Sequence, residues 1–360
     1  MKELLSKKEC TAMRGIAILA IVLHNYCHFI SEAVKENEYQ FFTSNNDGLW
    51  RAFTNPDALL PVHLLSYFGH YGVPVFLFLS GYGLVRKYET SQDACPSVRF
   101  VRYSYLKLLR MLIVGFSLFI CVDMVTPGRF PFHWDNVLAQ LLMYINVLPE
   151  PDKIIWPGIY WFFGLMMELY LVYRLLLYRR NSWIVVALIA VCWLLQAFCD
   201  PEGDTLNRLR YNCIGGMLPF GLGIIVARVR ALRTDSTFLT NSACAPYVPF
   251  LWLLVFIISV ALVFAMSFNF YTWLLWIPVF IILGTIALVK AMPQWMLKVF
   301  IWFGAISAAM FVAHPVARKL FITVAWKQDI YDGLMLYGIA VIALSWAVKQ
   351  IIDRILKPKL

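Results

Sequence analysis

Met13–Phe29 reads MRGIAILAIVLHNYCHF, and this stretch decides the fold class. An arginine stands near its start, two histidines stand near its end, and almost every residue between them is apolar. A membrane core about 30 Å thick is crossed by about 20 apolar residues in a helix. The stretch therefore predicts a membrane-spanning helix. Its Arg14, His24 and His28 point to function, because ionisable side chains are costly inside a bilayer.

Composition extends this interpretation to the whole chain. Of the 360 residues, 61% are hydrophobic and 14% are charged, whereas soluble domains are about 45–50% apolar and about 25% charged. We predict an all-α polytopic membrane protein in which residues 1–360 form a single integral domain with no soluble domain attached. No small-residue cleavage site follows Phe29, so we expect the first span to be retained. The eight cysteines show no ligand-type spacing, and no metal is expected.

Ten apolar segments have the length of membrane spans. They are roughly 13–31, 64–85, 103–125, 156–178, 182–199, 212–231, 248–268, 270–291, 298–321 and 332–353. Residues 136–148 are too short to span and are expected to form a re-entrant or interfacial piece. Most Lys and Arg residues fall on one side if both termini are cytoplasmic. That asymmetry explains the net charge of +10 without a nucleic-acid partner.

The outer loops are acidic and include Glu36, Glu38 and Asp152. Such a rim is either a plain solvated surface or the lining of a path for a saccharide.

Buried ionisable residues are the candidates for chemistry. His24 lies ten residues after Arg14, about 15 Å deeper in a helix, and is either a general base or a hydrogen-bonded core residue. Glu168 lies near the middle of its span and is expected to be protonated or paired with a cation such as His24. His314 and Arg318 lie one turn apart in the ninth span. The small residues around Gly304 predict a close helix contact there.

Four segments occur in an order that resembles a known family. They are MRGIAILAIVLH (13–24), VPVFLFLSGYGL (73–84), YWFFGLMMELYLVY (160–173) and FGAISAAMFVAHP (303–315). Together they resemble the membrane acyltransferase family 3, to which bacterial O-acetyltransferases of surface polysaccharides belong. The resemblance covers the whole chain. It implies an acyl-CoA-dependent O-acyltransferase in the inner membrane of a bacterium, which moves an acyl group, usually acetyl, from cytoplasmic acyl-CoA to a hydroxyl of a glycan or lipid-linked saccharide.

The resemblance also implies site residues. The family's signature arginine and histidine fall on Arg14 and His24, its glutamate on Glu168, and the histidine of its penultimate span on His314. The usual spacing leaves ten residues between arginine and histidine, whereas nine lie between them here. At 100° per residue, His24 is therefore about 80° from Arg14, and Asn25 takes the aligned position. His28 stays an alternative base.

The predicted roles follow from these positions. His24, Glu168, His28 and His314 are the catalytic candidates. Inner cations are expected to bind the phosphates of CoA, namely Arg14, Arg86, Arg102 and Arg110. Candidates for substrate binding are Asn25, His70, Ser80 and Arg318. Direct transfer and an acyl-histidine intermediate both stay open, as do acetyl and succinyl as the acyl group, and neither the acceptor nor the oligomeric state is predicted.

Two alternative functions use the same residues. One is a transporter or flippase that uses the buried ionisable groups as a relay, although no internal repeat supports it. The other is an acyltransferase with a lipid or small-molecule acceptor.

Overall fold

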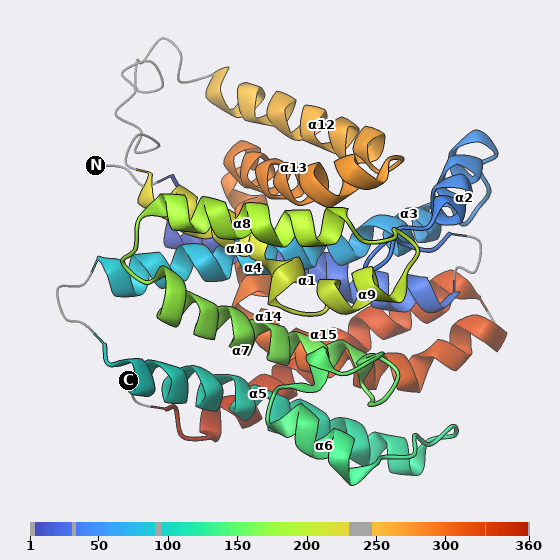
Figure 1. The fold of residues 1–360 in the computed structure, drawn as a ribbon. Coiled ribbons are helices and arrows are strands. Elements are labelled where there is room, and N and C mark those ends of the chain that lie inside the picture. The colour runs from blue at the N-terminus through green and yellow to red at the C-terminus, as the bar shows by residue number, and fades with distance from the viewer. Residues whose placement is uncertain (1–3, 31–33, 91–94, 230–246, 328, 359–360) are drawn as a thin grey trace.

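The computed structural model describes residues 4–30, 34–90, 95–229, 247–327 and 329–358. Within these ranges the regular structure is entirely helical, which confirms the predicted all-α membrane fold. The end of the predicted span 212–231 lies outside the described residues. Figure 1 shows long helices lying side by side in one bundle.

The long helices follow the predicted spans. In chain order they are α1 (Lys7–Ile30), the continuous run α3 (Leu60–Phe68), η1 (Gly69–Tyr71), α4 (Gly72–Leu84) and η2 (Val85–Glu89), then α5 (Ser97–Val125), the run η4 (Gly158–Tyr160), α7 (Trp161–Val172) and η5 (Tyr173–Leu177), α8 (Ser182–Ala197), α10 (Cys213–Arg228), α12 (Val248–Met266), α13 (Phe270–Ala291), α14 (Gln294–Lys327) and α15 (Ile330–Arg354). Short helices connect them: α2 (Thr43–Thr54), α6 (Trp134–Leu141), η3 (Ile145–Val147) and α9 (Asp204–Arg210).

Length and composition qualify eight or nine of the ten predicted spans among the described residues, and the exact number stays a prediction. Eight helical segments are long and apolar enough to cross a membrane, and a ninth forms if α9 and α10, bent by 42°, count as one span. The remaining helix, α8, has 16 residues and is therefore about 24 Å long, short of a bilayer core of about 30 Å. Residues 136–148 form α6 and η3, which are too short to span, as predicted.

The helix α1 packs closely along α14. A Cβ atom added to Gly15 would lie 2.0 Å from the carbonyl oxygen of Phe300, and one added to Gly304 would lie 1.8 Å from that of Thr11. Small residues thus allow the two backbones to touch, which confirms the close contact predicted around Gly304. The contact fixes α1, with its histidines, in the middle of the bundle.

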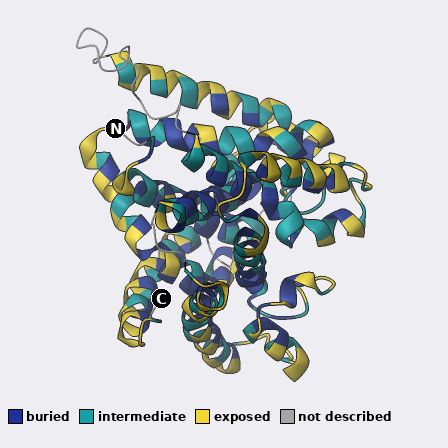
Figure 2. Cartoon of the chain, turned by 60° about the vertical axis from the view of Figure 1, so that its left-hand side comes forward, coloured by how far each residue is buried: buried dark blue, intermediate teal, exposed yellow. Residues whose placement is uncertain are grey.

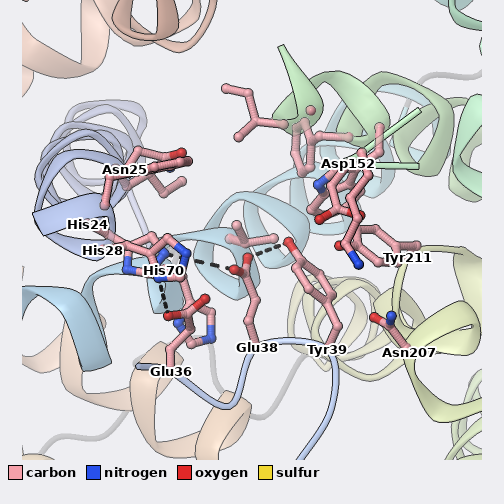
Figure 3. Close-up of a pocket in the computed structure, with 18 of the residues that line it drawn as sticks. His24, Asn25, His28, Glu36, Glu38, Tyr39, His70, Asp152, Asn207 and Tyr211 are labelled. Carbon is pink, nitrogen blue, oxygen red and sulfur yellow. Dashed lines mark hydrogen bonds and ion pairs between the residues drawn. The ribbon is translucent and has the colours of Figure 1, made fainter. Parts of the chain in front are cut away.

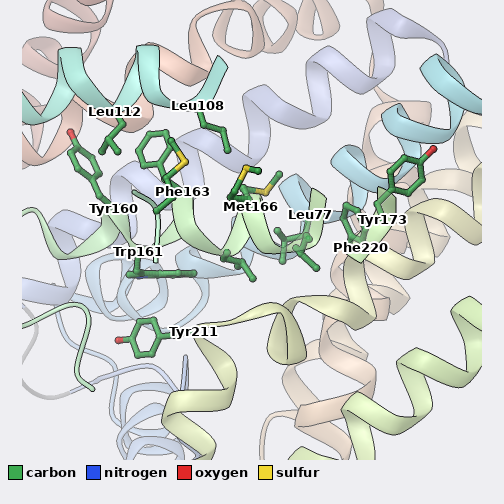
Figure 4. Packing of buried hydrophobic residues seen from close by; sticks show 14 of the residues in the cluster. Leu77, Leu108, Leu112, Tyr160, Trp161, Phe163, Met166, Tyr173, Tyr211 and Phe220 are labelled. Atoms are coloured by element: carbon green, nitrogen blue, oxygen red, sulfur yellow. The ribbon is translucent and has the colours of Figure 1, made fainter. Parts of the chain in front are cut away.

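The aromatic and methionine side chains around α7 form the largest buried cluster (Figure 4). Phe163 and Met166 of α7 pack with Leu108 and Leu112 of α5, and Phe220 of α10 belongs to the same cluster. Exposed residues lie mainly on the outer surfaces of the bundle (Figure 2). The helix α12 is only 11% buried over its most apolar window, which suits a helix that faces lipid.

Hydrogen bonds and ion pairs show which helix ends lie together. The Tyr82 hydroxyl donates to the Leu5 carbonyl at 3.3 Å, and Lys290 is 2.7 Å from Glu9, so the ends of α4 and α13 meet the start of α1. Arg110 in the first half of α5 donates to the carbonyl of Ile355, just after α15. The chain therefore enters α1 and leaves α15 at the same end of the bundle, at the left in Figure 1. That arrangement suits termini on one side; their cytoplasmic location stays a prediction.

Candidate functional site

Three histidines from two helical segments meet in the half of the bundle away from the chain termini, which is the outer half if the termini are cytoplasmic as predicted. The ring of His24 lies 5.5 Å from that of His28, one turn along α1, and 5.4 Å from that of His70 in η1. Gly69 makes the approach possible, because a Cβ there would lie 2.5 Å from the Cβ of His24. The structure thus brings both candidate bases and His70, a predicted substrate-binding residue, into one cluster.

The ring of His24 is held in a defined orientation. Its Nδ1 atom lies 2.9 Å from the backbone carbonyl oxygen of Ser66, and the residue is 4% exposed. A carbonyl only accepts, so in the neutral ring Nδ1 carries the proton and Nε2 keeps a free lone pair. Nε2 lies 3.8 Å from a carboxylate oxygen of Glu38. His24 therefore presents the basic nitrogen that a general base needs.

Two glutamates from the loop after α1 complete the cluster (Figure 3). Glu36 lies 2.7 Å from His28 Nδ1, and the Glu38 carboxylate accepts a hydrogen bond from the Tyr39 hydroxyl. From the sequence, both glutamates were predicted only as part of an acidic outer rim. One sequence feature could have predicted their place in the site: a Glu-x-Glu pair follows, within a few residues, a helix that has two histidines near its end.

The pKa values of the two glutamates are shifted in opposite directions. Burial raises the pKa of Glu38 well above its ordinary value, and the charge of Glu36 adds to that effect. Burial also acts to raise the pKa of Glu36, but the contact with His28 and the neighbouring imidazoles outweigh it and lower this pKa to about 2. Carboxyl pairs whose pKa values are pushed apart are typical of acid–base sites.

These residues line an outer cavity of about 340 Å³. Asn25 and Arg318, two predicted substrate-binding residues, also line it, and the guanidinium of Arg318 donates to the Asn25 side chain at 3.3 Å. That guanidinium lies over the ring of Phe29, 4.0 Å from the centroid, and 5.6 Å from the ring centroid of Trp156. The outer cavity thus combines a cation, carboxylates, amides and aromatic faces.

A second cavity, of about 570 Å³, lies between the same helices but nearer the start of α1. We call it the inner cavity. Arg14, Ser80 and Tyr170 line it together with Lys107, which the sequence analysis did not select. Within the described part of the chain, Arg14 has no hydrogen bond or ion pair to another residue, so its charge is available to a ligand. Two cations at one cavity suit an anionic molecule.

The other predicted donor-binding cations lie elsewhere. Arg102 lines a separate shallow groove with Ser97 and Val98, and Arg110 donates to the Ile355 carbonyl. Arg86 lies in η2 and lines neither cavity. The structure therefore brings only Arg14 of the four predicted arginines to the inner cavity. Position along the sequence predicted that all four arginines lie on the inner side. It did not predict which of them face the same cavity.

Glu168 and His314 lie apart from both cavities. The Glu168 carboxylate accepts the backbone N–H of Cys213 at 2.7 Å, so it sits at the N-terminus of α10, where a negative group is favourable. The expected contact between Glu168 and His24 is not formed. His314 is fully buried, with Nδ1 3.0 Å from the carbonyl oxygen of Met310. Neither residue lines the outer or the inner cavity.

The histidine cluster also contains possible metal ligands. His24, Glu38 and His70 form one set, and His24, His28 and Glu36 a second; in each, the possible ligand atoms lie within 4.8 Å of one another. Imidazole and carboxylate ligands suit Zn²⁺. The expectation of no metal stays a prediction.

A comparison with protein families decides the class. The family model for an acyltransferase domain matches residues 9–350. The chain belongs to acyltransferase family 3. The match includes α4, α5, α7, α14 and nearly all of α1, which line the two cavities, so this acyltransferase has both cavities within its family domain. No curated protein and no solved structure matches the chain.

Proposed function

We propose that this membrane acyltransferase works in the inner membrane of a bacterium and takes an acyl group, preferably acetyl, from acyl-CoA at the inner cavity. It transfers the group to a hydroxyl of a surface or exported glycan in the outer cavity. One observation carries the proposal: a cavity with two cations and a cavity with an imidazole cluster adjoin between the same helices.

The inner cavity suits the donor. CoA carries phosphates, and Arg14 and Lys107 supply positive charge at the end of the bundle where basic residues gather. A cytoplasmic opening would also satisfy the positive-inside rule. Ser80 and Tyr170 add hydroxyl groups that can hydrogen-bond to the amide groups of the pantetheine arm.

The outer cavity suits a hydroxyl-rich acceptor. Asp152 and Asn207 supply polar groups that can hydrogen-bond to sugar hydroxyls, and Trp156 supplies an aromatic face. A lipid acceptor is less well supported, because such a cavity would be lined mainly by apolar side chains. A relay for transport is disfavoured by the family, whose domain is an acyltransferase domain.

His24 is the base in the proposed reaction. Its Nε2 atom removes the proton of the acceptor hydroxyl as the oxygen attacks the carbonyl carbon of the thioester. The C–S bond then breaks, and the departing thiolate of CoA takes up the proton from the imidazolium. The products are the acyl ester and free CoA. The carbonyl of Ser66 keeps the imidazole in the required tautomer.

The test is a comparison of two buried histidines. We expect His24→Ala to lower acyl transfer by at least about 100-fold, the usual contribution of a general base, while the protein still inserts and stays monodisperse. His63→Ala is the matched control, because His63 is also buried but lies beside Asp57 and lines neither cavity.

The measurement combines CoA release by the purified protein with mass spectrometry of the surface glycan from cells with and without each variant. Near-normal transfer by His24→Ala would contradict the assignment and make His28 the base. An unchanged glycan in cells lacking the protein would contradict the acceptor class.

A further inference from the structure

The inner and outer cavities share four lining residues, Ile21, Val73, Phe162 and Phe311. Each comes from a different helix: α1, α4, α7 and α14 respectively. No other residue lines both cavities within the described part of the chain. We call this four-residue boundary the neck.

The neck lies at one level of the bundle. In α1, Ile21 lies between Arg14 of the inner cavity and His24 of the outer cavity, and is one turn, about 4.5 Å, from His24. In α4, Val73 lies in the same way between Ser80 and His70. The other two helices show the same order. In α7, Phe162 lies between Tyr170 of the inner cavity and Trp161 of the outer cavity, and in α14, Phe311 lies between Ser307 of the inner cavity and Arg318 of the outer cavity.

The neck is apolar and partly closed by two rings. The centroids of Phe162 and Phe311 lie 5.2 Å apart, with the planes tilted by 54°. Both rings and Val73 are half-buried, and Ile21 is 5% exposed. None of the four side chains carries a charge or a hydrogen-bonding group.

We propose that the neck is the site that selects the acyl group, and that it admits narrow, uncharged acyl groups such as acetyl. This inference rests on the proposed function. A donor held by Arg14 and Lys107 reaches His24 only if its acyl group enters the neck from the inner cavity. The two rings, whose centroids lie 5.2 Å apart, leave less room at the neck for a branched acyl group than for acetyl. The carboxylate of a succinyl group would have to lose water there with no partner, which is costly.

The experiment compares three donors, acetyl-CoA, isobutyryl-CoA and succinyl-CoA, with the full chain in lipid nanodiscs and a cell-envelope glycan extract as acceptor. Release of the CoA thiol gives kcat/KM for each donor. The wild type is expected to prefer acetyl-CoA by at least about tenfold over each of the other two, since added groups in a fitted pocket commonly change selectivity by that factor or more.

Variants of the neck should move this preference in a defined direction. Phe311→Ala and, independently, Phe162→Ala are expected to raise the isobutyryl-to-acetyl ratio about tenfold, because each removes a ring from the neck. Val73→Phe narrows the neck and is expected to lower acetyl transfer while acetyl-CoA still binds. The matched control is Phe303→Ala in α14, which removes a ring that lines neither cavity and should leave the ratio unchanged.

The outcomes separate the two proposals. An unchanged ratio in both Phe→Ala variants, with acetyl transfer intact, would overturn the role of the neck alone, as would equal use of the three donors by the wild type. A wild type that neither binds acetyl-CoA nor releases CoA from any donor would overturn the proposed function itself. Size-exclusion profiles identify a variant that has misfolded, in which case Phe311→Leu replaces Phe311→Ala.

Discussion

Glu36 and Glu38 are two residues apart, yet the same cluster affects them in opposite ways. Glu36 is beside an imidazole, which lowers its pKa, whereas burial beside another carboxylate raises the pKa of Glu38. The neutral acid is therefore favoured for Glu38 and the charged form for Glu36, whose negative charge can stabilise an imidazolium in the cluster. This gives the histidines an electrostatic environment that Arg14 and His24 alone did not indicate.

The raised pKa of Glu38 predicts how stability depends on pH. The folded protein keeps a proton that the unfolded chain releases above about pH 4.3, so stability falls as pH rises above that value. Glu38→Gln mimics the neutral acid. We expect its melting temperature in detergent to match the wild type near pH 4 and to exceed it near pH 8.

Glu36→Gln is the control with the opposite sign. The lowered pKa of Glu36 gives stability that is present above about pH 4.3 and lost as pH falls toward about 2. This variant should therefore melt below the wild type at pH 7, with a difference that shrinks in acid. Parallel curves for both variants and the wild type would contradict the opposite pKa shifts of Glu36 and Glu38.

At the scale of elements, the start of α10 provides the hydrogen-bond partner for the carboxylate of Glu168 in α7. The Glu168 side chain accepts the N–H at the start of α10, after Asn212, whose own side chain accepts the N–H of Ile214. The carboxylate thus holds the position of α10 against α7. From this contact we predict that Glu168 serves the folding of the bundle, whereas the sequence predicted a catalytic role.

This assignment gives a testable distinction between two variants. Glu168→Gln retains an oxygen that can accept the N–H of Cys213, so we expect transfer activity close to wild type. Glu168→Ala leaves that buried N–H without its partner and is expected to destabilise the protein by about 1–3 kcal/mol. Melting temperature and activity per folded molecule are the measurements. A large loss of activity in Glu168→Gln at unchanged stability would return Glu168 to the catalytic residues.

Hydropathy along the sequence predicted the helices but not the contacts between the loops and the helices. Hydropathy identified the helical segments, because lipid requires long apolar runs. It also predicted a span at α8, whose 16 residues are short for a bilayer core; whether α8 crosses the membrane stays a prediction. The pairing of Glu36 and Glu38 with His28 and His24 depends on a loop folding back over its own helix, and no periodic pattern encodes such a reversal.

At the scale of the whole molecule, we predict the orientation of the bundle in the membrane, with both termini in the cytoplasm. In a background without native cysteines, we expect Asp204→Cys, at the exposed start of α9, to react with a membrane-impermeant maleimide on intact cells. Lys357→Cys, just after α15 and also exposed, should react only after the cells are permeabilised. The reverse pattern would place the inner cavity outside the cell and contradict cytoplasmic acyl-CoA as the donor.

The neck has a consequence for the membrane itself. Two water-accessible cavities that open toward opposite sides of a bilayer would, if joined, form a pore through which protons and ions leak down the transmembrane potential. A narrow apolar constriction blocks such leakage because water leaves it readily and ions do not cross it without water. If the proposed function holds, Ile21, Val73, Phe162 and Phe311 must therefore also block ion leakage while the acyl group crosses between the cavities.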